Sequence, residues 1–126
     1  MRLLLDTNAF LWWVGDDARL GAGARDLLSD PATQVFVSAA TAWEISIKHA
    51  KGKLPYVDTP AEIAAHRFEP LAIDVEHGVA AGELPAYHRD PFDRVLVAQA
   101  RSESLTLLTA DEALERYDVA LVRADR

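Results

Sequence analysis

Five short apolar runs, spread along the whole chain, constrain its fold more than any other feature. They lie at residues 3–5, 35–37, 71–73, 105–108 and 119–122. Apolar runs of this length are typical of buried strands, because helices in globular proteins are usually at least twice as long. Thr106 is the one polar residue within these runs, and their nearly continuous apolar character indicates strands covered on both faces, as in a parallel sheet.

Longer segments with helical spacing separate these runs. They cover residues 22–28, 39–50, 60–68, 75–84, 91–102 and 111–117, and several begin at a proline or end before a glycine. Strands that alternate with helices predict an α/β fold, a three-layer sandwich around a central, mainly parallel sheet of four to five strands. The chain has 126 residues and no repeat or linker, so we expect a single domain over residues 1–126.

The charge balance limits how this chain could bind a polyanion. It has 13 Lys and Arg against 20 Asp and Glu, a formal net charge of −7, so local basic residues or metal ions would have to hold a nucleic acid. The absence of cysteine excludes disulfides, thiolate metal sites and thiol catalysis. The longest apolar run covers only residues 9–14, so we expect no membrane partner and a cytoplasmic location.

Acidic residues follow several of the predicted strands. Asp6 ends the first strand, Glu44 lies in the helix after the second, and Asp111 follows the fourth. Asp90 and Asp93 flank the start of the helix that leads into the fourth strand. In open α/β sheets, ligands bind beyond the carboxyl ends of the strands, so these side chains are candidates for one site.

Each of these acids also has a purely structural interpretation. Asp6 and Asp111 could cap helices, and Glu44 with Lys48 has the spacing of a solvated surface ion pair. Apolar neighbours of Glu44 favour a cleft position instead. Asp90, directly before a proline, is interpreted as a helix cap, which leaves Asp93 at the border of the buried face.

Taken together, the acids point to a metal site. Converging carboxylates repel one another and raise each other's pKa, and a divalent cation removes that repulsion. Ligand sets made only of oxygen atoms select Mg²⁺, or Mn²⁺, over zinc. Such a site can activate water and shield the charge of a phosphodiester.

Four blocks of sequence carry a family resemblance. They are Leu-Leu-Asp-Thr-Asn at 4–8, Ser-Ala-Ala-Thr-Ala-Trp-Glu-Ile-Ser-Ile-Lys at 38–48, His-Arg-Asp-Pro-Phe-Asp-Arg-Val-Leu-Val-Ala-Gln-Ala at 88–100, and Leu-Leu-Thr-Ala-Asp at 107–111. In this order they resemble the PIN-domain ribonucleases, and most closely the VapC-type toxins of type II toxin–antitoxin pairs.

The resemblance implies a function and a set of site residues. The metal-binding and catalytic positions are Asp6, Glu44, Asp93 and Asp111, with Asp90 as an additional candidate ligand, and Thr7, Asn8 and Thr109 match supporting polar positions. The implied activity is hydrolysis of RNA by metal-activated water with Mg²⁺ as cofactor. The implied partners are the RNA, a small cognate antitoxin and a second copy of the chain in a homodimer.

Basic residues near these acids are candidate RNA contacts. They are Lys48, Lys51, Lys53, Arg89 and Arg94, with His88 beside them. The lysines could equally be a solvated helix end, and Arg94 could pair with Asp90 one helical turn earlier. Of the adjacent Trp12 and Trp13, we expect one in the core and the other on a partner surface, whereas His66 and His77 are interpreted as structural.

A phosphoacceptor receiver domain is the main alternative, since it has a similar length, an α/β fold and an acidic Mg²⁺ site. Such a domain needs paired acids after the first strand and a lysine after the last. Here Asp6 is followed by Thr7, and no lysine occurs after Lys53. The missing lysine disfavours this alternative.

Overall fold

The computed structural model describes residues 1–126 and has a central sheet of five strands. They are β1 (Arg2–Leu5), β2 (Gln34–Ser38), β3 (Glu69–Leu71), β4 (Thr106–Thr109) and β5 (Leu121–Arg123). The strand order is β3-β2-β1-β4-β5, and all four pairings are parallel. The predicted parallel α/β sheet is therefore confirmed.

Six α-helices and one 3₁₀ helix connect the strands. They are α1 (Thr7–Val14), α2 (Ala22–Ser29), α3 (Ala39–Ala50), α4 (Thr59–Ala65), α5 (Val75–Glu83), α6 (Pro91–Ser102) and the 3₁₀ helix η1 (Glu112–Arg116). The bounds of α3 and α6 are those that the sequence predicts. None of these helices combines the length and apolar character that crossing a membrane would require.

Two predicted elements are displaced. The helix expected over 60–68 ends at Ala65, because Arg67 takes a left-handed backbone conformation (φ 58°), which terminates helices. The strand expected over 71–73 instead covers Glu69–Leu71 and includes Pro70. β3 is an edge strand, where a proline without an N–H is tolerated, and its extent is set by pairing with β2.

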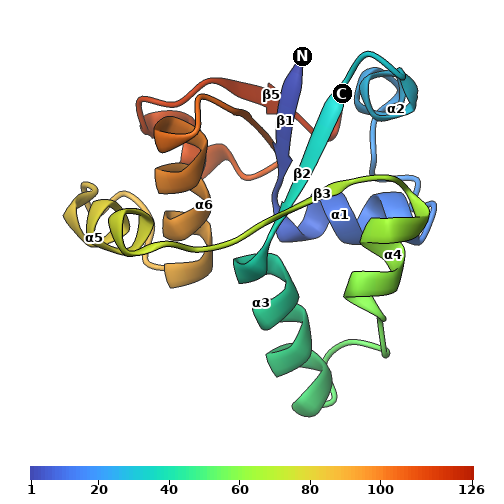
Figure 1. The fold of residues 1–126 in the computed structure, drawn as a ribbon, viewed down its shortest axis with the longest axis horizontal. Coiled ribbons are helices and arrows are strands. Elements are labelled where there is room, and N and C mark those ends of the chain that lie inside the picture. Colours follow the sequence, from blue (N-terminus) through green and yellow to red (C-terminus); the bar gives the residue numbers. More distant parts are fainter.

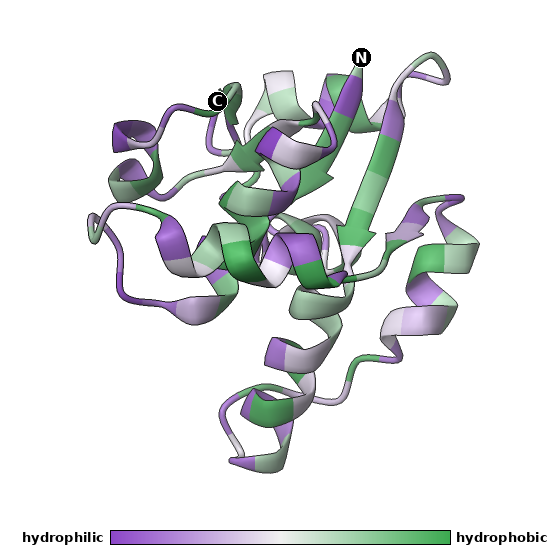
Figure 2. Cartoon of the chain, turned by 60° about the vertical axis from the view of Figure 1, so that its left-hand side comes forward, coloured by the Kyte–Doolittle hydropathy of each residue, from purple (hydrophilic) through white to green (hydrophobic).

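Apolar side chains cover both faces of the sheet and give three layers. Leu3 and Leu5 pack in a core with residues of α1 and α2, whereas Leu4 points to a second core with residues of α5 and α6. Figure 1 shows α1, α2 and α4 on one side of the sheet and α5 and α6 on the other. In Figure 2 the central strands are predominantly hydrophobic, as strands buried on both faces must be.

The strand order creates a switch point between β1 and β4. From β1 the chain proceeds to β2 and β3 on one side, then returns to β4 on the other side of β1. Ligands of open α/β folds bind at such points, beyond the carboxyl ends of the strands. In Figure 1, α3 extends past this edge of the sheet.

The tryptophans differ from the expectation. Neither Trp12 nor Trp13 is fully buried and neither is exposed, because the guanidinium of Arg19 lies 5.1 Å from the Trp12 ring and Trp13 Nε1 donates to His66 Nδ1 (3.3 Å). The predicted division into one core and one surface tryptophan is therefore wrong. The exposed tryptophan of this chain is Trp43.

Candidate metal centre

Asp6 links the two strands at the switch point. Its Oδ1 accepts the backbone N–H of Ala9 (2.8 Å) and caps α1, and its Oδ2 accepts the hydroxyl of Thr109 at the end of β4 (2.6 Å). The side chain is buried, with the residue 5% exposed. Asp6 thus fits both interpretations of its sequence position. Its Oδ1 caps α1, and its Oδ2 is held by Thr109 at the predicted site.

Glu44 enters the site from α3. The residue is 6% exposed, its Oε1 accepts the hydroxyl of Thr7 (2.6 Å), and its Oε2 pairs with Lys48 Nζ (2.7 Å). The expected pair with Lys48 therefore exists, but its carboxylate is buried rather than solvated. The cation also offsets part of the negative charge in the cleft.

Asp90 and Asp93 have the different positions that the proline between them predicts. Asp90 caps α6, since its Oδ1 accepts the N–H of Phe92 (2.8 Å) and, more weakly, that of Asp93 (3.4 Å). The side chain of Asp93 is only 19% exposed and turns toward the other acids. Capping by Asp90 is confirmed.

The sequence indicated His88 only as a residue that could contact RNA, and its position among the site acids was not predicted. Its Nε2 lies 2.8 Å from Asp111 Oδ2 and 3.2 Å from Asp93 Oδ2, while its Nδ1 accepts the N–H of Asp90 (3.0 Å). That acceptor role places the proton of the neutral ring on Nε2, which then donates to the carboxylates. Asp111 lies 23 residues away along the chain, so no local pattern could have indicated this contact.

Burial and mutual repulsion shift the acidities of two site carboxyls. Burial, together with the charges of Asp90 and Asp6, raises the pKa of Asp93 from 3.8 to about 7, against the opposing effect of His88. Burial also raises the pKa of Asp6 to about 6, against the hydrogen bonds from Thr109 and the N–H of Ala9. These shifts show that the acids lie close enough to interact across a poorly solvated site.

The donor set fits a hard divalent cation. One ligand atom each from His88, Asp93 and Asp111 lies within 4.8 Å of the others, and the charges of Asp6 and Glu44 act on Asp93. Carboxylate oxygens dominate this set, as Mg²⁺ and Mn²⁺ prefer. The raised pKa values of Asp93 and Asp6 also fit a cation site, because a bound cation would favour the charged form of each acid.

A second group, Asp74, His77 and Glu103, also gathers potential ligand atoms. Its geometry is already explained by a capping box at the start of α5, in which Asp74 accepts from the His77 N–H and His77 Nδ1 accepts from the Asp74 N–H. The structural interpretation of His77 is confirmed.

Comparison with known proteins identifies the family. The family model for the PIN domain matches residues 3–120. The chain belongs to the PIN-domain family. This membership argues against the receiver-domain alternative. A search of curated protein sequences gave no match.

Solved structures with the same fold include several toxin–antitoxin complexes. VapBC2 from Rickettsia felis, bound to a promoter DNA fragment, matches with a TM-score of 0.72 at 16% identity, over 98% of each chain. DNA-bound VapBC from Salmonella typhimurium gives 0.70 at 18% over 98% of each chain, and a toxin–antitoxin complex from Klebsiella pneumoniae gives 0.66 at 18% over 95% of each. At these identities the likeness establishes the fold.

Beside the acids of this PIN domain lies a basic pocket of about 350 Å³. It is lined by Glu44, Ile47, Lys48, Lys51, Lys53, Arg89, Asp90, Pro91 and Phe92. Four of the five basic residues that the sequence singled out are therefore brought together next to Glu44. The end of α3 and the start of α6 form its walls.

Two residues that the sequence indicated for the site, Arg94 and Asn8, do not lie with the others. Arg94 does not line the pocket, because its guanidinium donates to main-chain carbonyls of the α5–α6 connection, among them Ala81 (2.8 Å) and Leu84 (3.0 Å). The suggested ion pair with Asp90 is wrong for the same reason. Asn8 is exposed and makes no hydrogen bond to a site carboxylate, whereas Thr7 and Thr109 both do.

Proposed function

We propose that this PIN domain is a divalent-metal-dependent endoribonuclease and the toxin of a toxin–antitoxin pair. The observation that carries the proposal is the meeting of Asp6, Glu44, Asp93 and Asp111 at the switch point, with the pKa of Asp93 raised to about 7 and that of Asp6 to about 6. Natural folds retain such costly clusters of buried acids chiefly at functional sites.

The site residues have distinct tasks in this proposal. The metal would be held by Asp6, Glu44, Asp93 and Asp111. Asp90 would instead remain the cap of α6. A bound Mg²⁺ or Mn²⁺ would supply the positive charge that acidifies water and shields the phosphodiester. The hydroxyls of Thr7 and Thr109 fix one oxygen each of Glu44 and Asp6, which orients their carboxylates without adding charge.

The basic pocket would bring the RNA to these acids. Lys48, Lys51, Lys53 and Arg89 can neutralise phosphates on the side of α3 that faces α6. An acidic chain of net charge −7 repels a polyanion elsewhere, so this local patch would direct the backbone toward Glu44. Hydrolysis of an RNA phosphodiester by activated water then needs no nucleophilic side chain.

The toxin assignment rests on the fold neighbours. Structures described as VapBC or toxin–antitoxin complexes share this fold over nearly the whole chain. We therefore propose a small cognate antitoxin as the partner, together with a homodimer of this chain, the commonest symmetric state. An antitoxin arginine could replace the missing cation charge among the four carboxylates.

The test is cleavage of total RNA by the purified protein. We expect cleavage with Mg²⁺ and none in EDTA, and a loss of several orders of magnitude in Asp6→Asn. Asp16→Asn is the matched control, because that acid is exposed and remote from the site. Full activity in EDTA would contradict the metal mechanism.

Growth of a bacterial host tests the toxin role separately. Wild type alone should arrest growth, Asp6→Asn should not, and the neighbouring small reading frame should restore growth and co-purify. If wild type is harmless and binds no such product, the toxin proposal fails while a nuclease activity can still stand.

A further inference from the structure

Trp43 is exposed in a position where the fold gains little from it. The residue is 62% exposed, whereas Trp12 and Trp13 are half-buried against the core of α1 and α2. A buried indole contributes 150–250 Å² of apolar contact, so leaving most of one in water forgoes much of that stabilisation. Most of the ring is therefore available to contact a ligand.

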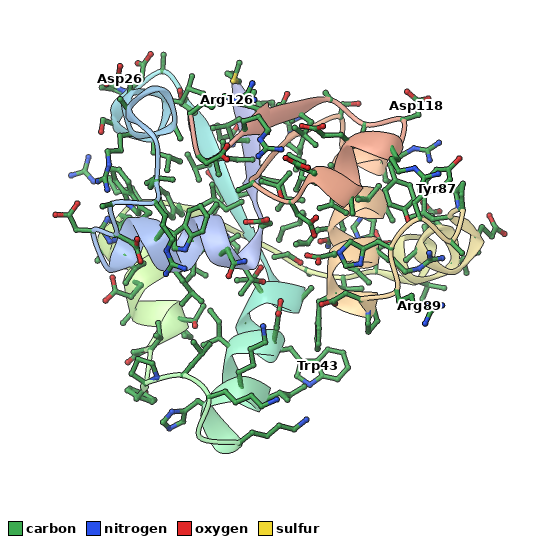
Figure 3. All side chains as sticks on the ribbon, turned by 180° about the vertical axis from the view of Figure 1, so that it is seen from behind. Asp26, Trp43, Tyr87, Arg89, Asp118 and Arg126 are labelled. Atoms are coloured by element: carbon green, nitrogen blue, oxygen red, sulfur yellow. The ribbon has the colours of Figure 1, made fainter.

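Phe92 holds the indole of Trp43 from the side. The two rings meet edge to face, with centroids 5.2 Å apart and planes at 82°. Phe92 is half-buried on α6 and packs against the core on that face of the sheet. Figure 3 shows Trp43 projecting from α3 toward the N-terminal end of α6. Phe92 thus fixes the indole of Trp43 on one side and leaves most of its surface free.

This aromatic pair adjoins both the acids and the basic pocket. Trp43 directly precedes Glu44 on α3, and Phe92 directly precedes Asp93 on α6. Phe92 also lines the pocket that contains Lys48 and Arg89. A ligand with its phosphate near the carboxylates and its backbone along the lysines would therefore carry its bases past the free indole.

We propose that Trp43, held by Phe92, stacks an unpaired base of the RNA next to the bond that is cut. The inference rests on the proposed ribonuclease function and narrows its substrate to single-stranded or looped RNA. Bases in an A-form duplex are stacked on one another, whereas unpaired bases are free to stack on aromatic side chains. Stacking tolerates any base and combines with a basic groove that follows the backbone.

Charge favours RNA over an apolar protein segment as the occupant. The pocket beside Trp43 is lined by nine residues, of which only two are hydrophobic, and four carry a positive charge. The chain offers apolar surface elsewhere, in a groove of about 660 Å³ between α3, α4 and β3 where eight of the twelve lining residues are hydrophobic. An apolar helix would bury more area there.

Tryptophan fluorescence in metal-free buffer tests the inference without relying on cleavage. The probes are a single-stranded oligoribonucleotide of mixed sequence, the same strand in a duplex, and the single strand with its bases removed at successive positions. We expect the single strand to quench wild-type fluorescence. Trp43→Phe should bind with little quenching, and Trp43→Ala should bind about 5- to 150-fold more weakly, the range for loss of one stacked base.

Tyr56→Ala is the matched control, because Tyr56 is at least as exposed as Trp43 but lies with His49 on the other side of α3. Its affinity for the single strand should be unchanged. The abasic series should show one position at which removing the base weakens binding to wild type but not to Trp43→Ala.

Three results would overturn the inference. They are unchanged single-strand affinity in Trp43→Ala, equal quenching by the duplex, and a Trp43→Ala variant that loses only self-association or antitoxin binding. Cleavage of total RNA by the same wild-type preparation distinguishes failure of the stacking site from failure of the proposed ribonuclease function. Mg²⁺-dependent cleavage without dependence on Trp43 refutes the stacking site alone, whereas no cleavage and no binding refutes the proposed function as well.

Discussion

Replacing Asp93 by asparagine should stabilise the protein in the absence of metal. The substitution keeps the shape of the side chain and removes a buried negative charge that faces Asp90, Asp6 and Glu44. In the unfolded chain the charge of Asp93 carries no burial cost, because the side chain is solvated there and its pKa is near 3.8. The folded state alone therefore gains from the change.

The raised pKa of Asp93 sets the upper limit of this stabilisation. A shift in the Asp93 pKa from 3.8 to about 7 corresponds to about 4 kcal/mol of unfolding free energy above pH 7. The asparagine amide must still be desolvated, and the attraction to His88 weakens, so we expect a gain of about 1–3 kcal/mol. For a chain of this size that is roughly 3–15 °C in melting temperature.

The effect has a defined pH dependence. Near pH 4 the folded Asp93 holds its proton and the unfolded one is about half protonated, so wild type and variant should melt at similar temperatures. As the pH rises toward 7 the unfolded state releases this proton first, and wild-type stability falls relative to Asp93→Asn. Above pH 7 the difference should be constant.

Thermal unfolding followed by circular dichroism in EDTA, from pH 4 to 8, measures this difference. Saturating Mg²⁺ should narrow or reverse it, because a ligand at a hundred times its Kd adds about 3 kcal/mol to wild type only. Asp16→Asn should show neither behaviour. An Asp93→Asn variant that melts below wild type at pH 8 in EDTA, or a difference equal at pH 4 and pH 8, would refute the reasoning.

Three further predictions concern single side chains. Asp90→Ser retains a capping oxygen and should keep most RNA cleavage, whereas Asp93→Ser should lose it; the opposite result in the same assay would reassign the ligand. Arg94→Met leaves several carbonyls of the α5–α6 connection without their donor and should lower the unfolding free energy by about 2–4 kcal/mol in urea titrations. An unchanged unfolding free energy would mean that the guanidinium does not make these hydrogen bonds. Thr109→Val removes the hydrogen bond to Asp6 and should raise the pKa of Asp6 above about 6, measurable by carboxyl NMR titration; an unchanged value would mean that the bond is not formed.

Local pattern was sufficient for two of the longer helices and for the acids at the start of one of them. The bounds of α3 and α6 follow from the residues that begin and end them, and the separate positions of Asp90 and Asp93 follow from Pro91 between them. The same reasoning failed at β3, whose extent depends on pairing with β2 rather than on its own apolar residues. It also failed for Arg94, because its carbonyl partners come from a connection whose path is not encoded in helical spacing.

The sequence by itself determined that buried strands alternate with helices and that Asp6 and Asp111 follow two of those strands, since run length, prolines and capping residues act locally. Only the tertiary structure decided that β1 and β4 are neighbours, so that Thr109 donates to Asp6 across 103 residues and His88 joins Asp93 to Asp111. The same packing brings Trp43 against Phe92. Strand order and these side-chain contacts depend on how the helices cover the two faces of the sheet, a long-range competition among packings that no short window of sequence records.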